Sequence, residues 1–192
     1  TSIKGDTLTF TDVTAELNLG NSVVDIPGST VVYRPPDNTN VLEYTFKFYQ
    51  DGYVSGAYQA GCYGVYVDDV PMGQFTIKNM DRGSNANIMQ ITAVFKIGGG
   101  YANGTTPNET HGEFASWTTT KTIKVRGKKA STNSNYNVRL FKTNSGRQNP
   151  YLPSDENDSN YRIQRPILKL VAIGTKTETS GGGSSGGSGV TN

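Results

Sequence analysis

Polar and apolar residues alternate along several short stretches of this chain, and the alternation predicts β-strands. Every second residue is apolar in residues 42–48, in 89–97 and, more briefly, in 136–140. The apolar positions are Leu42, Tyr44, Phe46 and Phe48, then Met89, Ile91, Ala93, Phe95 and Ile97, then Tyr136, Val138 and Leu140. A period of two is typical of a strand with one face in a hydrophobic core.

The last candidate strand, residues 167–173, differs from the others because both of its faces are apolar. Leu168 and Leu170 alternate with Ile167, Val171 and Ile173. A strand of this kind is buried on both sides. Two interpretations stay open: it is a central strand of the domain, or one face lies against a neighbouring subunit.

Weaker alternation and turn residues complete an all-β pattern. The weaker candidates are residues 7–13, 15–19, 23–26, 30–33, 64–67, 74–77 and 122–126. Together these give roughly nine to eleven short strands, with turn residues every eight to twelve positions or so, as in a sandwich or barrel. No stretch has helical periodicity with caps.

The 192 residues are expected to form one domain with two less structured ends. We predict an N-terminal strand segment or attachment arm over 1–20, the domain over 20–174, and a flexible tail rich in Gly and Ser over 175–192. Within the domain, residues 144–162 have two prolines and few apolar side chains, which predicts a long exposed loop.

Charge argues against nucleic acid as a partner. The formal net charge is only +2, whereas nucleic-acid modules concentrate basic charge on one face. One local group of basic residues, interpreted as the polar face and turn of a hairpin, comprises Lys121, Lys124, Arg126, Lys128 and Lys129. No apolar run approaches the ~20 residues of a membrane span, so a membrane is not expected either.

The sequence supplies no constellation for catalysis or metal binding. Cys62 and His111 are the only residues of their kinds, so an intrachain disulfide and a zinc site within one chain are excluded. The acids at 68–69 and 155–158 lack the spacing of a calcium loop and are interpreted as turn residues. We therefore predict no catalytic residue, no metal and no cofactor, and an enzyme such as a polysaccharide depolymerase is disfavoured.

Tyrosine is the one residue type that suggests a binding surface. Tyrosine gives a large contact area with a polar tip, which suits glycan and partner surfaces. The candidate surface comprises Tyr49, Tyr53, Tyr58, Tyr63 and Tyr66. The alternative is that some of them belong to a strand and others cover loop backbone. Trp117 precedes a candidate strand and is interpreted as a core or rim anchor rather than a sugar-stacking residue.

Three stretches, taken in order, resemble a domain of structural proteins of marine bacteriophages, cyanophages especially. The first runs from Gly28 to Pro36 (GSTVVYRPP) and continues as NVLEYTFKF at 40–48. The second is GEFASWTTTKTIKV at 112–125, and the third is RPILKLVAI at 165–173. The resemblance covers roughly residues 20–174, and its motifs are structural rather than catalytic.

This resemblance implies a jelly roll of the complement C1q and tumour-necrosis-factor type, with about 8–10 antiparallel strands. It also implies a virion protein that forms a homotrimer, with other virion proteins as partners, in capsid decoration or in fibre or tail assembly. The candidate oligomer interface is then the last strand, with Ile167, Leu168, Leu170, Val171 and Ile173. The alternative function is a host-glycan-binding tip domain of a tail fibre.

Overall fold

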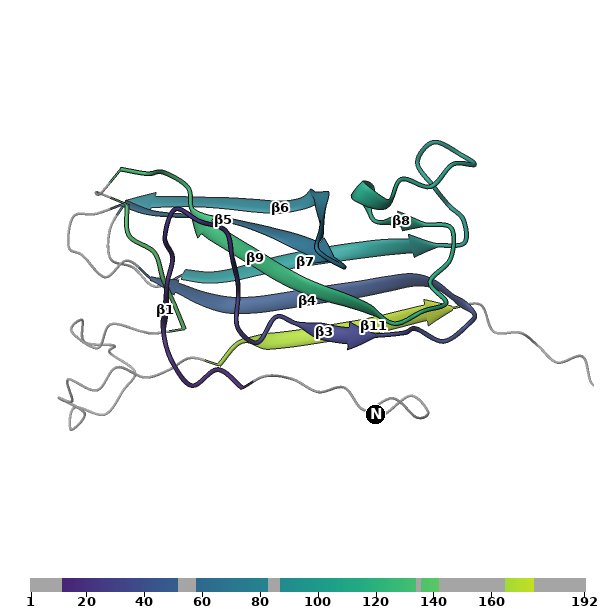
Figure 1. Cartoon of the computed structure of the whole chain (residues 1–192), viewed down its shortest axis with the longest axis horizontal. Helices are drawn as coiled ribbons and strands as arrows, with labels where there is room; N and C mark the ends of the chain where they lie inside the picture. The colour runs from purple at the N-terminus through teal and green to yellow at the C-terminus, as the bar shows by residue number, and fades with distance from the viewer. Residues whose placement is uncertain (1–11, 52–57, 83–86, 134–135, 142–164, 175–192) are drawn as a thin grey trace, which may run out of the picture.

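The computed structural model describes residues 12–51, 58–82, 87–133, 136–141 and 165–174, and these form an all-β sandwich of two packed sheets (Figure 1). Sheet A contains β1 (Leu17–Asn18), β10 (Arg139–Leu140), β4 (Thr39–Asp51), β11 (Ile167–Gly174), β7 (Asn87–Ile97) and β8 (Glu113–Phe114). Sheet B contains β2 (Val24–Asp25), β3 (Val31–Tyr33), β9 (Lys121–Lys129), β5 (Tyr58–Val67) and β6 (Val70–Arg82). A short 3₁₀ turn, η1 (Glu109–His111), precedes β8. The predicted all-β sandwich is confirmed.

The strands pair in a nested order. β5 pairs with β6, β4 with β7, β2 and β3 with β9, and β1 with β10. Successive nested pairs alternate between sheet B and sheet A, which is the strand order of a jelly roll. All pairings are antiparallel except that of β7 with β8, so sheet A is mixed where the prediction was purely antiparallel.

The alternating positions found in the sequence form the core. Leu42, Tyr44, Phe46 and Phe48 of β4 are buried, as are every second residue of β7 from Ile91 to Ile97. The hydroxyl of Tyr44 donates a hydrogen bond to the carbonyl oxygen of Ser29 at 2.6 Å. This bond satisfies the one polar atom that the Tyr44 ring carries into the core.

Two glycines of sheet B leave room for an aromatic ring in the core. A Cβ atom at Gly127 would lie 2.6 Å from the ring of Tyr63, and a Cβ at Gly61 would also collide with that ring. Tyr63 is 3% exposed, and its hydroxyl donates to Oε1 of Gln50 at 2.5 Å. The glycines therefore let Tyr63 pack flat against sheet B.

Some sequence predictions need correction. Residues 121–129 form one continuous strand, β9, and not the strand and turn of a hairpin, because their neighbours on both sides come from other strands. Only Arg139–Leu140 of residues 136–140 is a strand. Conversely, 74–77 is a small part of β6, whose Pro71 and Gly73 weaken the alternation.

The predicted N-terminal arm is partly integrated into the domain, because β1 lies in sheet A and Val13 and Leu19 belong to the core. Several other predictions fall outside the described residues. These are residues 7–11 of the candidate strand at 7–13, the predicted loop at 144–162 and the tail at 175–192.

Candidate functional surfaces

The outer face of sheet A, away from the core, combines exposed isoleucine and valine with the charged residues Glu43, Lys47, Lys96 and Lys169. Exposed apolar side chains here are Ile88 (65%), Val94 (41%), Ile167 (63%) and Ile173 (52%). The register places Ile173 beside Val41 and Ile167 beside Lys47, and Glu43 of β4 lies between Val171 of β11 and Val94 of β7. Ile88 lies beside Tyr49. Thr45 and Thr92 meet on this face through a 3.2 Å hydrogen bond. Polar and charged side chains thus interrupt the apolar surface without covering it.

The predicted oligomer-interface residues of β11 divide between two faces. Leu168 and Leu170 are half-buried and pack against the core. Ile167, Val171 and Ile173 face outward on sheet A. Among the described residues β11 pairs with β4 alone, so it is an edge strand (Figure 1). Within the described ranges, β11 has one strand neighbour and an exposed outer face, which differs from the arrangement of a central strand buried on both sides.

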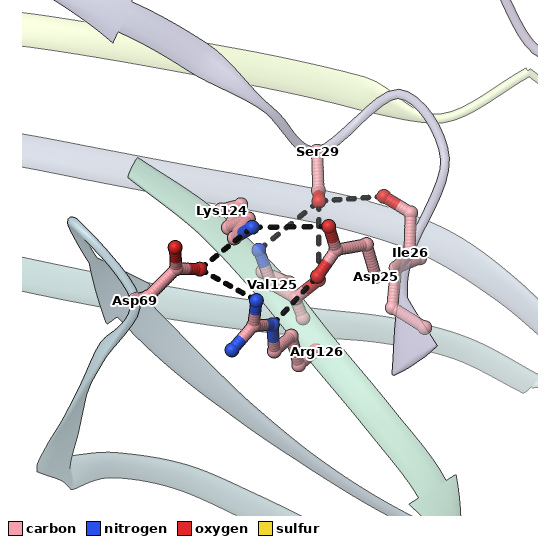
Figure 2. A network of polar contacts seen from close by, with 7 residues as sticks. All are labelled: Asp25, Ile26, Ser29, Asp69, Lys124, Val125 and Arg126. Carbon is pink, nitrogen blue, oxygen red and sulfur yellow. Dashed lines mark hydrogen bonds and ion pairs between the residues drawn. The ribbon is translucent and has the colours of Figure 1, made fainter. Parts of the chain in front are cut away.

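The outer face of sheet B carries a connected network of ion pairs. Lys124 and Arg126 of β9 lie between Asp25 of β2 and Asp69 of the β5–β6 turn (Figure 2). The Nζ atom of Lys124 lies 3.0 Å from Asp25 Oδ2 and 2.9 Å from Asp69 Oδ1. Arg126 donates from Nε to Asp25 at 2.6 Å and from Nη2 to Asp69 at 2.5 Å. The network joins three segments that are distant in sequence.

Local backbone structure places the two acids. Asp68 and Asp69 have positive φ values of 48° and 67°, which reverse the chain between β5 and β6. Asp25 is paired with Arg126 in the register of β2 and β9. Beneath it, Ser29 Oγ donates to the carbonyl of Ile26 at 2.6 Å and accepts from the Val125 N–H at 3.0 Å (Figure 2).

The network shifts the proton affinities of its members. Burial raises the pKa of Asp25, but hydrogen bonds from Arg126 and Lys124 outweigh burial and hold that pKa below its ordinary value. The hydrogen bond from Lys124 lowers the pKa of Asp69, and hydrogen bonds to Asp69 and Asp25 raise the pKa of Lys124. All of them are therefore charged at neutral pH.

A shallow groove of about 260 Å³ lies on the same outer face, beside the network. Its lining comes from β5, β6 and β9 and from the residue before β2. The lining side chains that the later argument uses are Val23, Cys62, Tyr66, Thr76, Lys78 and Lys128. The guanidinium of Arg126 lies over one face of the Tyr66 ring, 4.8 Å from its centre.

The three predicted tyrosines whose side chains the structure describes do not share one surface. Tyr63 points into the core, as the strand interpretation required. Tyr49 lies on the outer face of sheet A and Tyr66 on that of sheet B, on opposite sides of the sandwich. Tyr53 and the side chain of Tyr58 lie outside the described residues. Tyr66 lines a hollow on the outer face of sheet B.

Trp117 is a core residue, as predicted. It is 4% exposed and packs against Phe114 and Phe95, with ring centres 4.9 and 5.6 Å away. A second hollow of about 330 Å³ lies above it, between the turn at 35–40 and residues 115–118. The Nε1 atom of Trp117 is buried, so the indole offers this hollow no exposed donor.

A buried ion pair escaped the sequence analysis. Arg139 Nη2 donates to Asp51 Oδ2 at 2.9 Å, and both side chains are at most 6% exposed. The one available signal was that the alternation in β4 ends in two polar residues, Gln50 and Asp51, which are fully buried. The pair joins β10 to the end of β4.

Within the described ranges, no group of three or more His, Cys, Asp or Glu side chains could hold a metal ion. No helix among these residues is long and apolar enough to cross a membrane. No protein-family model, curated protein or solved structure matches this chain.

Proposed function

We propose that this chain is a bacteriophage virion structural protein, a trimeric jelly-roll module that serves capsid decoration or fibre or tail assembly. The outer face of sheet A is its assembly surface.

The arrangement of the three phage-like stretches supports one continuous structural unit. The first stretch contains β3 and most of β4, the second contains β8 and the start of β9, and the third contains β11. β3 pairs with β9 in sheet B, and β4 pairs with β11 in sheet A. Segments that are distant in sequence are thus joined as two strand pairs of the same sandwich.

The exposed apolar side chains on sheet A are the observation that carries the proposal. Three isoleucines of the described ranges are exposed, and all three lie on this face. They are Ile88, Ile167 and Ile173. Burial of apolar surface is the main driving force of association, at roughly 25 cal/mol per Å². Covering this face with other copies of the chain would remove it from water.

Light scattering of the full chain at micromolar concentration tests the proposal. We expect a mass three times the chain mass of 20.7 kDa. Replacing Ile167 and Ile173 by lysine should dissociate the trimer, because it places charge in an apolar contact.

The matched control replaces Val32 and Val70 by lysine. These two residues are 56% and 44% exposed and belong to strands of sheet B. This variant should remain trimeric. A monomeric wild-type chain, or equal dissociation of both variants, would contradict an assembly surface on sheet A.

The virion role needs its own test. Mass spectrometry of purified particles of a virus that encodes this chain should recover its peptides, at a copy number divisible by three. Recovery in the infected host but not in the particle would exclude a virion structural role.

Binding of a host glycan is the second candidate function. One observation favours it: Tyr66 borders a groove on the face of the sandwich opposite to the proposed assembly surface. A module that assembles through sheet A would leave this groove open.

A further inference from the structure

Three basic residues of β9 face outward in line on sheet B, but they have different surroundings. Lys124 and Arg126 are held by Asp25 and Asp69. Lys128, the next outward residue, is exposed, and among the described residues no acid pairs with it. Arg126 also lines the groove, so the ion-pair network borders the groove and Lys128 lies beyond its last member.

The strand register places a second lysine opposite Lys128. Cys62 of β5 pairs with Lys128 of β9 on one side and with Lys78 of β6 on the other. Lys78 is also exposed, and no described acid pairs with it. Since neighbouring strands lie about 4.8 Å apart, the two lysine backbones flank the groove at roughly 10 Å.

Small side chains line the base of the groove between the two lysines. The outward positions next to Cys62 are Gly64 on its own strand and, paired with Gly64, Thr76 on β6. Gly64 has no side chain to fill the space, and a Cβ there would make only ordinary contacts, 3.5 Å from Thr76 and 3.7 Å from Tyr66. Val23 and Tyr66 add apolar and aromatic walls.

From this geometry we propose that the groove binds an acidic saccharide, with Lys78 and Lys128 holding its carboxylate or sulfate group and one sugar ring lying over Gly64 beside Tyr66. The inference deepens the second proposed function, and it is independent of trimer formation. A volume of 260 Å³ is slightly below the ~300–1,000 Å³ of pockets for drug-sized ligands, which suits one or two sugar rings. Charge-assisted hydrogen bonds from the two lysines would make the groove selective for a saccharide with an anionic group.

Other anionic partners fit the groove less well. An acidic peptide recognised as an added strand needs a free sheet edge, whereas Cys62 and Gly64 already pair with strands on both sides. Nucleic acid needs many phosphate contacts for useful affinity, and here two lysines without an acidic partner stand in a chain of net charge +2.

Cys62 provides a direct measurement, because it is the only cysteine, is partly exposed and lines the groove. The rate of its alkylation by iodoacetamide is measured on the full chain with trigalacturonate, a sulfated galactose trisaccharide, neutral maltotriose, inorganic sulfate or a dT oligonucleotide. At ten times its Kd, an acidic trisaccharide should slow alkylation about tenfold. Maltotriose and inorganic sulfate at the same concentration should not.

Two variants locate the contact. Replacing Lys78 and Lys128 by glutamine should raise the Kd obtained from protection by about tenfold for each lysine removed. Gly64→Ala should weaken it by filling the floor of the groove. The control replaces Lys47 and Lys169 by glutamine, which removes the same charge from the outer face of sheet A and should leave protection unchanged.

Each remaining outcome overturns the inference in a distinct way. Equal protection by maltotriose would leave a glycan site that does not require acid, so the second function would survive and the acidic saccharide would not. Equal protection by inorganic sulfate would mean a plain anion site, and stronger protection by the oligonucleotide would mean nucleic acid. Failure of every saccharide to protect Cys62 would exclude the groove as a glycan site.

Discussion

The two sheets of this sandwich share one core but have opposite outer faces. Sheet A presents Ile88, Val94, Ile167 and Ile173 to the outside. Sheet B exposes Val32 and Val70, and it also carries an ion-pair network and a groove between two lysines. The inner faces form the core and stabilise the fold. The outer face of sheet A is suited to apolar contact, and the outer face of sheet B is suited to a charged ligand.

The largest effect should separate the inside of sheet A from its outside. Phe95 and Val94 are neighbours in β7, and Phe95 is fully buried among Phe75, Phe114 and Trp117. Phe95→Ala should lower the free energy of unfolding by about 3–5 kcal/mol, because it removes the ring and leaves a cavity. Val94→Ala should cost less than about 0.5 kcal/mol in the monomer.

Urea denaturation at several protein concentrations measures both variants, since stabilisation by association depends on concentration. Val94→Ala should matter more as concentration rises. Equal losses for the two variants at high dilution would contradict the assignment of Val94 to an outer face.

A smaller effect should separate the two sides of sheet B. Gly127→Ala places a methyl group 2.6 Å from the Tyr63 ring and should destabilise the fold by about 1–3 kcal/mol through overpacking. Gly64→Ala points into the open groove and should change stability by no more than about 0.5 kcal/mol. Thermal unfolding of both variants decides this, and a larger loss for Gly64→Ala would contradict the packing described for Tyr63.

The smallest effect concerns the ion pairs of sheet B and depends on pH. The pKa values of Asp25 and Asp69 are lowered by folding, so their contribution is complete above the unfolded value of about 3.9 and is lost as pH falls through the folded values. Asp25→Asn should therefore reduce stability at pH 7 and matter less as the pH falls below 4. Since exposed pairs contribute about 0–1 kcal/mol, the change at pH 7 is small.

Calorimetry of wild type and Asp25→Asn from pH 2 to 7 gives the comparison. The two melting temperatures should converge in acid. A difference that grows as the pH falls would show that Asp25 does not stabilise the fold through its charge.

Much of the fold could be predicted from the sequence because a strand with one buried face has a strict period of two. β4 shows this pattern over 42–48 and β7 over 89–97, and both strands were found. β6 was found only in part, because Pro71, Gly73 and exposed polar residues interrupt its pattern. The basic residues of β9 suggested a turn because sequence alone does not show that β2, β3 and β5 lie alongside that strand.

The candidate surfaces were harder to predict, because they depend on register. The tyrosines are close in sequence, yet Tyr49 and Tyr66 lie on different sheets. Tyr63 faces the core because it is an odd number of positions from the outward-facing Tyr66 on the same strand. Lys78, Cys62 and Lys128 are far apart in sequence and become neighbours only through pairing. In β11 apolar residues on both faces could be read from the sequence, but the exposure of the face with Ile167 and Ile173 could not.

The most direct test of a covered sheet A and an open sheet B is the rate of lysine acetylation, read by mass spectrometry. Lys47 and Lys169 lie on the outer face of sheet A, and Lys78 and Lys128 on that of sheet B. In the assembled wild type, Lys47 and Lys169 should react more slowly than Lys78 and Lys128, and the variant with lysine at 167 and 173 should lose this protection. Equal rates for all four lysines in the assembled wild type would contradict assembly through sheet A.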